Sequence, residues 1–199
     1  MTRTVFVSTV GSTGDWQPVV KMFKEEGWIV TQVYPGESPP DLVCFTGGSD
    51  VSPYLYGEEN VSSYCDPKRD EYEKELYDHF LSLGVPMVGI CRGGQLLNVL
   101  NGGRMIQDLT HRMSGLEPLD IEYDYLRVQV DHHQGMLHGD SAVLISGYMS
   151  TLGHNDELDS IGAIILYPNT NCLCFQPHPE WGHQPTKELF FELLEEYLF

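Results

Sequence analysis

The segment Gly89–Gln95 reads Gly-Ile-Cys-Arg-Gly-Gly-Gln, a pattern that suits nucleophilic catalysis. It follows the apolar run Val85–Ile90 and precedes a helical pattern, so Cys91 is expected at a sharp strand-to-helix turn. Side chains two positions either side of a nucleophile would collide there, and Gly89 and Gly93 remove those collisions. The free amides and positive potential of the helix N-terminus favour the thiolate. The pattern therefore predicts a cysteine nucleophile, with a structural cysteine as the alternative.

A thiolate nucleophile needs a group that transfers protons, and Phe175–Glu180 supplies a candidate in its sequence Phe-Gln-Pro-His-Pro-Glu. The two prolines hold this segment extended. Residues two apart in an extended chain face the same way, so Glu180 can reach the imidazole of His178, fix its tautomer and stabilise its charged form. The predicted catalytic triad is therefore Cys91, His178 and Glu180. The alternative for this segment is an ordinary polar loop.

A third segment, Phe45–Pro53, also follows an apolar strand and reads Phe-Thr-Gly-Gly-Ser-Asp-Val-Ser-Pro. In a parallel sheet it would lie at the same carboxyl edge as Cys91. Backbone amides of Gly48 and Arg92 could then hold a developing oxyanion. Taken alone, paired glycines after a strand indicate only a turn.

The elements that must position these residues follow a regular order. In the first half, short apolar runs alternate with helical patterns, which is typical of a parallel α/β sheet. Strands are expected at Thr4–Thr9, Ile29–Tyr34, Leu42–Thr46 and Val85–Ile90. Helices are expected from Trp16 to Gly27, from Pro67 to Gly84 and over Gly93–Leu100.

The helix from Pro67 to Gly84 has the strongest local signals. Asp66 is a suitable N-cap, Pro67 suits the first helical position, and Gly84 suits the end. Its apolar stripe is expected to comprise Tyr72, Leu76 and Phe80. Its acidic residues are expected on a solvated outer face; they are Asp70, Glu71, Glu73, Glu75 and Asp78.

The second half is richer in strand patterns. Strands are expected at Asp120–Tyr125, Arg127–Val130, Ala142–Gly147, Ile161–Tyr167 and Cys172–Phe175, before a last helix over Thr186–Tyr197. Together the patterns predict an α/β three-layer sandwich, with a mainly parallel central sheet and a small antiparallel extension. Residues 1–199 are expected to form a single domain.

Composition limits the classes of function. The chain carries 11 Lys and Arg against 29 Asp and Glu, a formal net charge of −18. A surface this acidic repels phosphate backbones and anionic lipid, which argues against nucleic acid or membrane as the main partner. Five cysteines do not suit a disulfide framework. With no signal-peptide pattern and no apolar run of about 20 residues, a reduced cytoplasmic protein is expected.

Metal chemistry is not expected, although His132, His133 and His138 cluster in the sequence. Adjacent side chains diverge, and no matching Cys/His pair has the spacing of a zinc site. No cofactor is expected either.

Three motifs occur in the order found in class I glutamine amidotransferases; they are Thr46–Pro53, Gly89–Val99 and Gln176–Trp181. The chain resembles this family from about Thr4 to Trp181, and most resembles its γ-glutamyl-γ-aminobutyrate hydrolase branch, which is peptidase C26-like. Further similarities are Arg69-Asp70, Gln107-Asp108-Leu109 and His132-His133-Gln134. The resemblance implies a flavodoxin-like fold.

The resemblance also implies roles. Cys91 would attack the side-chain amide of glutamine or of a γ-glutamyl conjugate and form a thioester that water hydrolyses. His178 would shuttle the proton, with Glu180 orienting it. Gln95 would contact the glutamyl group, and the backbone around His133 and Gln134 would hold its amino-acid end.

Three functions remain open at this point. The chain could be a self-sufficient hydrolase of glutamine or a γ-glutamyl amine. It could be a glutaminase subunit that delivers ammonia to a separate synthetase partner. It could also be a non-catalytic binding or regulatory module on the same fold, although intact Cys91, His178 and Glu180 argue against that.

Overall fold

The structure is a computed structural model that describes residues 2–9, 16–33, 38–110, 112–121, 124–147 and 161–199. The helices are α1 (Trp16–Glu25), α2 (Pro67–Ser82), α3 (Arg92–Leu100) and α4 (Gln184–Tyr197), with short 3-10 turns η1 (Pro53–Tyr56) and η2 (Pro179–Trp181). No helix in the described part of the chain is long and apolar enough to cross a membrane.

Nine of the described strands form one sheet. They are β1 (Thr4–Val7), β2 (Ile29–Thr31), β3 (Leu42–Phe45), β4 (Met87–Ile90), β5 (Arg104–Ile106), β8 (Gly135–Leu137), β9 (Val143–Gly147), β10 (Ile161–Tyr167) and β11 (Cys172–Phe175). A separate hairpin joins β6 (Met113–Ile121) to β7 (Asp124–His132).

The sheet has a parallel part and an antiparallel part. Its order is β2-β1-β3-β4-β11-β10-β8-β5, with β9 also paired to β10. Strands β2, β1, β3, β4 and β11 run parallel, whereas the pairs of β10 with β11, β8 and β9 are antiparallel. This confirms the predicted mainly parallel sheet with an antiparallel extension.

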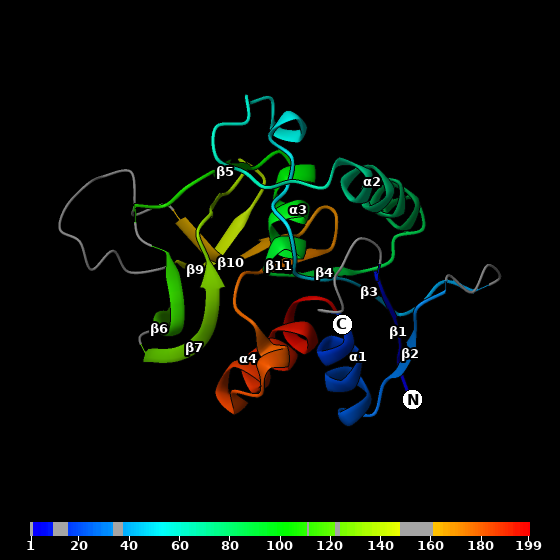
Figure 1. The fold of residues 1–199 in the computed structure, drawn as a ribbon. Helices are drawn as coiled ribbons and strands as arrows, with labels where there is room; N and C mark the ends of the chain where they lie inside the picture. Colours follow the sequence, from blue (N-terminus) through cyan, green and yellow to red (C-terminus); the bar gives the residue numbers. More distant parts are fainter. Residues whose placement is uncertain (1, 10–15, 34–37, 111, 122–123, 148–160) are drawn as a thin grey trace.

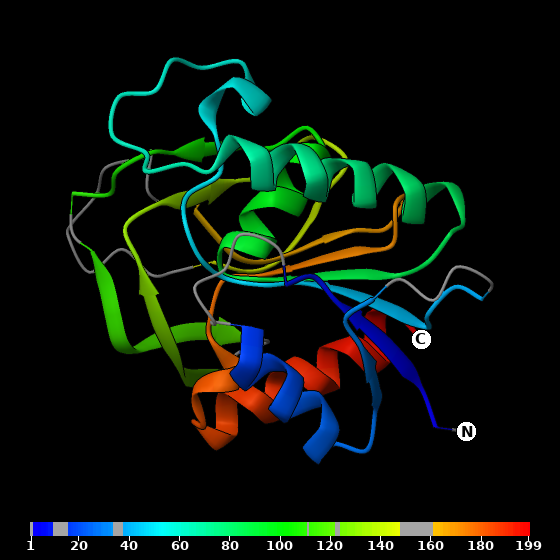
Figure 2. The same cartoon turned by 45° about the vertical axis from the view of Figure 1, so that its right-hand side comes forward.

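Helices cover both faces of the sheet, as Figures 1 and 2 show: α1 and α4 lie on one side, α2 and α3 on the other. The alternation of side chains along a strand explains why β3 has no polar residue. Leu42 and Cys44 pack in the cluster with α1 and α4, while Val43 and Phe45 pack in the cluster with α2 and α3. The predicted three-layer sandwich is therefore confirmed.

Most predicted elements are present with boundaries that differ by a few residues, and Tyr34, the predicted end of β2, lies outside the described residues. The predicted strand Asp120–Tyr125 is wrong. Ile121 ends β6 and Asp124 begins β7, so Asp120 and Tyr125 face one another across a hairpin. In the sequence, acidic residues alternate with Ile121, Tyr123 and Tyr125 over this segment and imitate one strand. Strands β5 and β8 were not predicted, because three residues are too few to show a period.

Helix α2 begins and ends as predicted. The Asp66 side chain accepts a hydrogen bond from Arg69 N at 3.2 Å, and Gly84 follows the helix with a φ of 67°. Its predicted faces are partly wrong, because Tyr72 is 39% exposed while Asp70 and Glu73 are fully buried. These carboxylates lie in the interior because each pairs with a buried arginine, which a pattern of apolar residues cannot reveal.

Candidate active site

Cys91 lies in the turn between β4 and α3, with a φ of 51°. Positive φ is uncommon for a residue with a side chain and marks strain that the surroundings must hold. A Cβ on Gly89 would lie 2.2 Å from the Gly93 backbone, and a Cβ on Gly93 would lie 2.2 Å from Phe45 O. Glycine is therefore required at both positions, since β3, β4 and α3 meet there without room for a methyl group.

His178 is held from several directions. Its Nδ1 lies 2.7 Å from Glu180 Oε1, and the two side chains are 7% and 3% exposed. Its backbone N donates to Gln129 O in β7 at 2.8 Å. The ring of Trp181 stacks on the imidazole, with centroids 3.8 Å apart. These contacts fix both the position and the tautomer of the ring.

Cys91 and His178 meet beside Gly47. A Cβ on Gly47 would lie 3.5 Å from His178 Cε1 and 3.9 Å from Cys91 Cβ. Burial lowers the pKa of His178, but attraction and hydrogen bonding to Cys91, and then to Glu180, outweigh burial and raise this pKa to about 11. The imidazole of His178 therefore holds a proton beside the Cys91 sulfur, where it can serve as a proton donor.

The triad residues line one cavity of about 720 Å³. Its other walls come from the loop Gly47–Ser49, the segment Tyr64–Lys68, Trp181, and the ion-paired residues Arg112 and Asp131. This volume is in the range of small-molecule sites. The structure thus brings Cys91, His178 and Glu180 to one cavity. Their roles as nucleophile, base and orienting carboxylate stay a prediction.

Of the two residues predicted for an oxyanion hole, Gly48 lines the same cavity as Cys91 and Arg92 directly follows Cys91 in the chain. Gly48 lines the cavity, with a φ of 136°. Arg92 begins α3, and its side chain is buried against Asp70 and Glu73. Burial and the nearby charge of Arg69 lower the pKa of Arg92 to about 9, against the opposing effect of Asp70.

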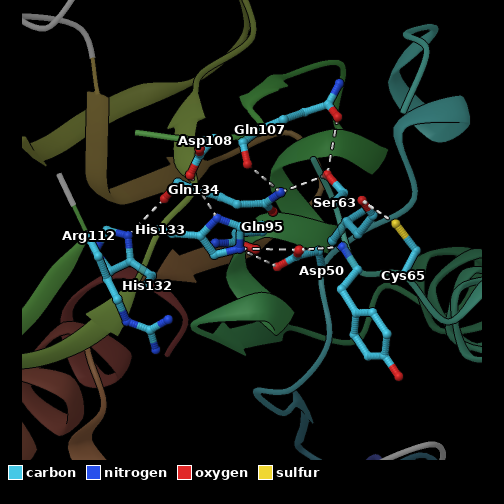
Figure 3. Close-up of polar contacts among 12 residues, drawn as sticks. Asp50, Ser63, Cys65, Gln95, Gln107, Asp108, Arg112, His132, His133 and Gln134 are labelled. Atoms are coloured by element: carbon cyan, nitrogen blue, oxygen red, sulfur yellow. Dashed lines mark hydrogen bonds and ion pairs between the residues drawn. The ribbon is translucent and has the colours of Figure 1, made fainter. Parts of the chain in front are cut away.

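Gln95, His133 and Gln134 are not among the residues that line the cavity. Figure 3 shows their side chains close to one another, with Gln134 in contact with Ser63 and His133 with Asp50. Gln95 is buried and donates to Gln176 Oε1 at 3.1 Å. Gln134 is buried and donates to Ser63 Oγ at 2.8 Å. Their side chains therefore serve internal contacts in this structure, and their role toward a substrate stays a prediction.

His133 lies between two carboxylates, with Nδ1 3.2 Å from Asp108 Oδ1 and Nε2 3.2 Å from Asp50 Oδ2 (Figure 3). The neighbouring His132 is different: burial lowers its pKa to about 4, and its Nδ1 lies 2.8 Å from Gln134 O. Among the described residues, no group of three or more His, Cys, Asp and Glu side chains is arranged to hold a metal ion.

The cavity residues that the sequence analysis did not assign include three charged ones, Lys68, Arg112 and Asp131. Arg112 Nη2 lies 2.6 Å from Asp131 Oδ1, in an exposed ion pair between β7 and the residue before β6. Lys68 could have been found, because it lies in the first turn of the helix whose start Asp66 and Pro67 predict. The hairpin pair could not, because its own sequence carries no catalytic motif.

Comparison with known proteins finds a matching family model and curated relatives. Residues 38–148 match the model of the family Peptidase C26. The chain is 31% identical over 172 residues to the glutamine amidotransferase-like protein YvdE of Lactococcus lactis subsp. lactis, covering 77% of this chain and 72% of that protein. It is 30% identical over 157 residues to the γ-glutamyl-γ-aminobutyrate hydrolase of Escherichia coli O157:H7, covering 67% of this chain and 61% of that protein.

A solved structure shares the fold at much lower identity. A GMP synthase component from Thermoplasma acidophilum superposes with a TM-score of 0.71 at 14% identity, covering 98% of this chain and 94% of that one. The chain therefore belongs to the Peptidase C26 family and has the flavodoxin-like fold of class I glutamine amidotransferases. The resemblance found in the sequence is confirmed.

Proposed function

We propose that the protein hydrolyses the γ-amide bond of glutamine or of a γ-glutamyl amine through a thioester on Cys91. The observation that carries the proposal is the placement of Cys91 at a strained turn beside His178, whose Nδ1 is held by Glu180 at 2.7 Å. The relatives support it, since one of them is a γ-glutamyl-γ-aminobutyrate hydrolase. Glutamate and ammonia, or glutamate and an amine, are the products.

In the first step, the Cys91 thiolate attacks the amide carbon and the carbonyl oxygen becomes an oxyanion. The backbone amides of Gly48 and Arg92 hold that oxyanion. The protonated imidazole of His178 then gives its proton to the amide nitrogen, the C–N bond breaks, and ammonia or the amine leaves. Glu180 keeps the ring in position and stabilises its charged form.

In the second step, a water molecule attacks the thioester. Neutral His178 removes a proton from that water, the oxyanion forms again in the same place, and the C–S bond breaks to release glutamate. The proton remains on His178 beside the regenerated thiolate. Gln95 and the backbone around His133 and Gln134 hold the glutamyl part, whose amino-acid end is charged.

A second candidate is the release of ammonia for a partner enzyme. The solved structure with a TM-score of 0.71 is described as one subunit of a GMP synthase. A glutaminase of this kind would use the same triad on glutamine and would depend on a synthetase partner for its rate. The test of the proposal separates these two enzymes.

The experiment is a turnover screen of the purified chain on glutamine and on a panel of γ-glutamyl amines, with coupled detection of glutamate. Cys91→Ala is the negative variant. Cys65→Ser is the matched variant for chemical labelling, because Cys65 is a second free cysteine that lines the same cavity. A glutamine-like electrophile is expected to label wild type and Cys65→Ser once, and Cys91→Ala not at all.

Rapid turnover of a γ-glutamyl amine supports the self-sufficient hydrolase. Slow glutamine turnover that rises when a synthetase is added favours the ammonia-delivering enzyme. If the chain neither turns over any of these amides nor is labelled at Cys91, the proposal is wrong and a binding module on this fold remains.

A further inference from the structure

A buried network of four charges joins helix α2 to the turn that carries Cys91. Arg69, Asp70, Glu73 and Arg92 are each 1% exposed or less. Arg92 pairs with both Asp70 and Glu73, and Arg69 Nε lies 3.3 Å from Glu73 Oε1. Two positive and two negative charges therefore balance in the interior, and removing any one of them would leave its partner buried and uncompensated.

Arg69 also binds the loop that follows β3. Its Nη1 donates to Gly47 O and its Nη2 donates to Thr46 O, both at 2.9 Å. A Cβ on Gly48 would lie 2.3 Å from Arg69 Nη1, so the loop packs directly on the guanidinium. One planar fork thus fixes two successive backbone carbonyls.

The direction of one amide follows from this contact. Gly47 O and Gly48 N belong to the same peptide unit, and in a planar trans peptide the carbonyl and the N–H point in opposite directions. Because the guanidinium holds Gly47 O on the interior side, the N–H of Gly48 is turned away from Arg69. Gly48 lines the cavity that Cys91 and His178 share.

The same contact affects donor strength. A positive charge that binds a carbonyl oxygen polarises the peptide and makes its N–H a better donor. The other proposed oxyanion donor is the backbone amide of Arg92. The side chains of Arg92 and Arg69 both form ion pairs with Glu73. Both donors are therefore tied to one buried unit on α2.

We propose that Arg69 is a positioning residue that orients and polarises the Gly47–Gly48 peptide, so that Gly48 N–H can stabilise the oxyanion. This inference rests on the proposed function, because an oxyanion forms only if Cys91 attacks a carbonyl group. Arg69 does not touch the substrate and acts through the peptide. A purely structural role in holding α2 is the competing explanation.

The test must separate catalysis from folding. Arg69→Met leaves the network with an excess negative charge, whereas Arg69→Met/Glu73→Gln keeps it neutral. For this double variant, kcat on the best γ-glutamyl amide is expected to fall about 100-fold, the effect of losing one oxyanion donor, with little change in KM. The rate of Cys91 alkylation by iodoacetamide is expected to be unchanged, because that reaction forms no oxyanion.

Two further variants complete the design. Lys74→Met removes an exposed cation from the same helix, which pairs with Asp78, and is expected to leave kcat unchanged. Arg69→Lys keeps the charge, but one ammonium group cannot reproduce the fork to two carbonyls. Its kcat is expected to fall about tenfold, which keeps the inference testable if the double variant does not fold.

Three results would overturn the inference. Wild-type kcat in the double variant would show that Arg69 serves the fold alone. If the rate of Cys91 alkylation in the double variant fell as much as kcat, the substitution would be acting on the reactivity of the Cys91 sulfur and not on the oxyanion. An absence of amide turnover in the wild-type chain would overturn the proposed function itself, and this result is seen before any Arg69 variant is measured.

Discussion

The indole of Trp181 lies flat against the imidazole of His178, with ring centroids 3.8 Å apart and an angle of 9° between the planes. Trp181 directly follows Glu180, so one short turn carries both groups that hold the imidazole. Glu180 holds the ring at its edge, and the indole holds it by its face. An aromatic face also favours a positive charge on the ring.

Trp181→Ala is expected to lower kcat about fivefold, because a cation–π contact with a half-exposed indole contributes about 1 kcal/mol. Trp181→Phe keeps an aromatic face and is expected to lose less than about threefold. Steady-state kinetics on both variants, with circular dichroism to verify folding, checks this. Equal kcat in Trp181→Ala and wild type would contradict a role for the indole.

The stability of the protein is expected to depend on the charge of His178. Its pKa in the fold is about 11, above the ordinary value of 6.5, so the protonated ring stabilises the folded state. That stabilisation is complete below about pH 6.5 and is lost as the pH rises through about 11.

Glu180→Gln removes one partner of this charge, so its deficit in unfolding free energy relative to wild type is expected to shrink between about pH 7 and about pH 11. Denaturant titrations at several pH values measure the deficit. Glu188→Gln is the matched control, because Glu188 lies on the exposed side of α4, where it accepts a hydrogen bond from Gln184. Its unfolding free energy relative to wild type is expected not to change with pH over this range. A deficit that is constant across this range would contradict the assigned charge state.

Because Glu73 is a buried, ion-paired carboxylate, its neutralisation is expected to lower the stability of the fold strongly. Glu73→Gln is expected to destabilise the fold by about 3 kcal/mol, because Arg69 and Arg92 would lose a charged partner in the interior. Glu75→Gln, on the exposed side of the same helix, is expected to change stability by less than about 0.5 kcal/mol. Urea unfolding of both variants distinguishes them. Similar values for the two would show that Glu73 is not a paired interior charge.

The tight turn at Cys91 predicts intolerance of a single methyl group. In Gly93→Ala, the new Cβ would lie 2.2 Å from Phe45 O, so strand β3 and helix α3 must move apart. A loss of about 3 kcal/mol in unfolding free energy is expected, together with loss of activity. Thermal unfolding measures the change in stability, and a turnover assay measures the change in activity. Gly93→Ala with normal stability would mean that the turn is looser than described.

The two candidate motifs, around Cys91 and around His178, could be recognised in the sequence because each is local. Cys91 is flanked by its own glycines and His178 stands two residues from Glu180, so both motifs occur within short segments. The α/β order could be predicted for the same reason, since each strand and helix carries its own period.

The buried charges and the hairpin could not be predicted in this way. Arg92 meets Asp70 and Glu73 only after the chain has folded, and acidic residues on a helix are usually exposed. Arg112 and Asp131 face each other through pairing of β6 and β7, a contact between strands that composition does not specify. Gln95 and Gln134 were assigned through resemblance, and the structure places their side chains in internal hydrogen bonds.

The most direct test of the central claim is to trap the acyl-enzyme. Wild-type protein is mixed with a γ-glutamyl anilide, quenched in acid within the first turnover, and examined by intact and peptide mass spectrometry. We expect the mass of one γ-glutamyl acyl group on the peptide that contains Cys91, and none in Cys91→Ala. Substrate turnover with the acyl group on another residue, or unaffected by Cys91→Ala, would contradict the account.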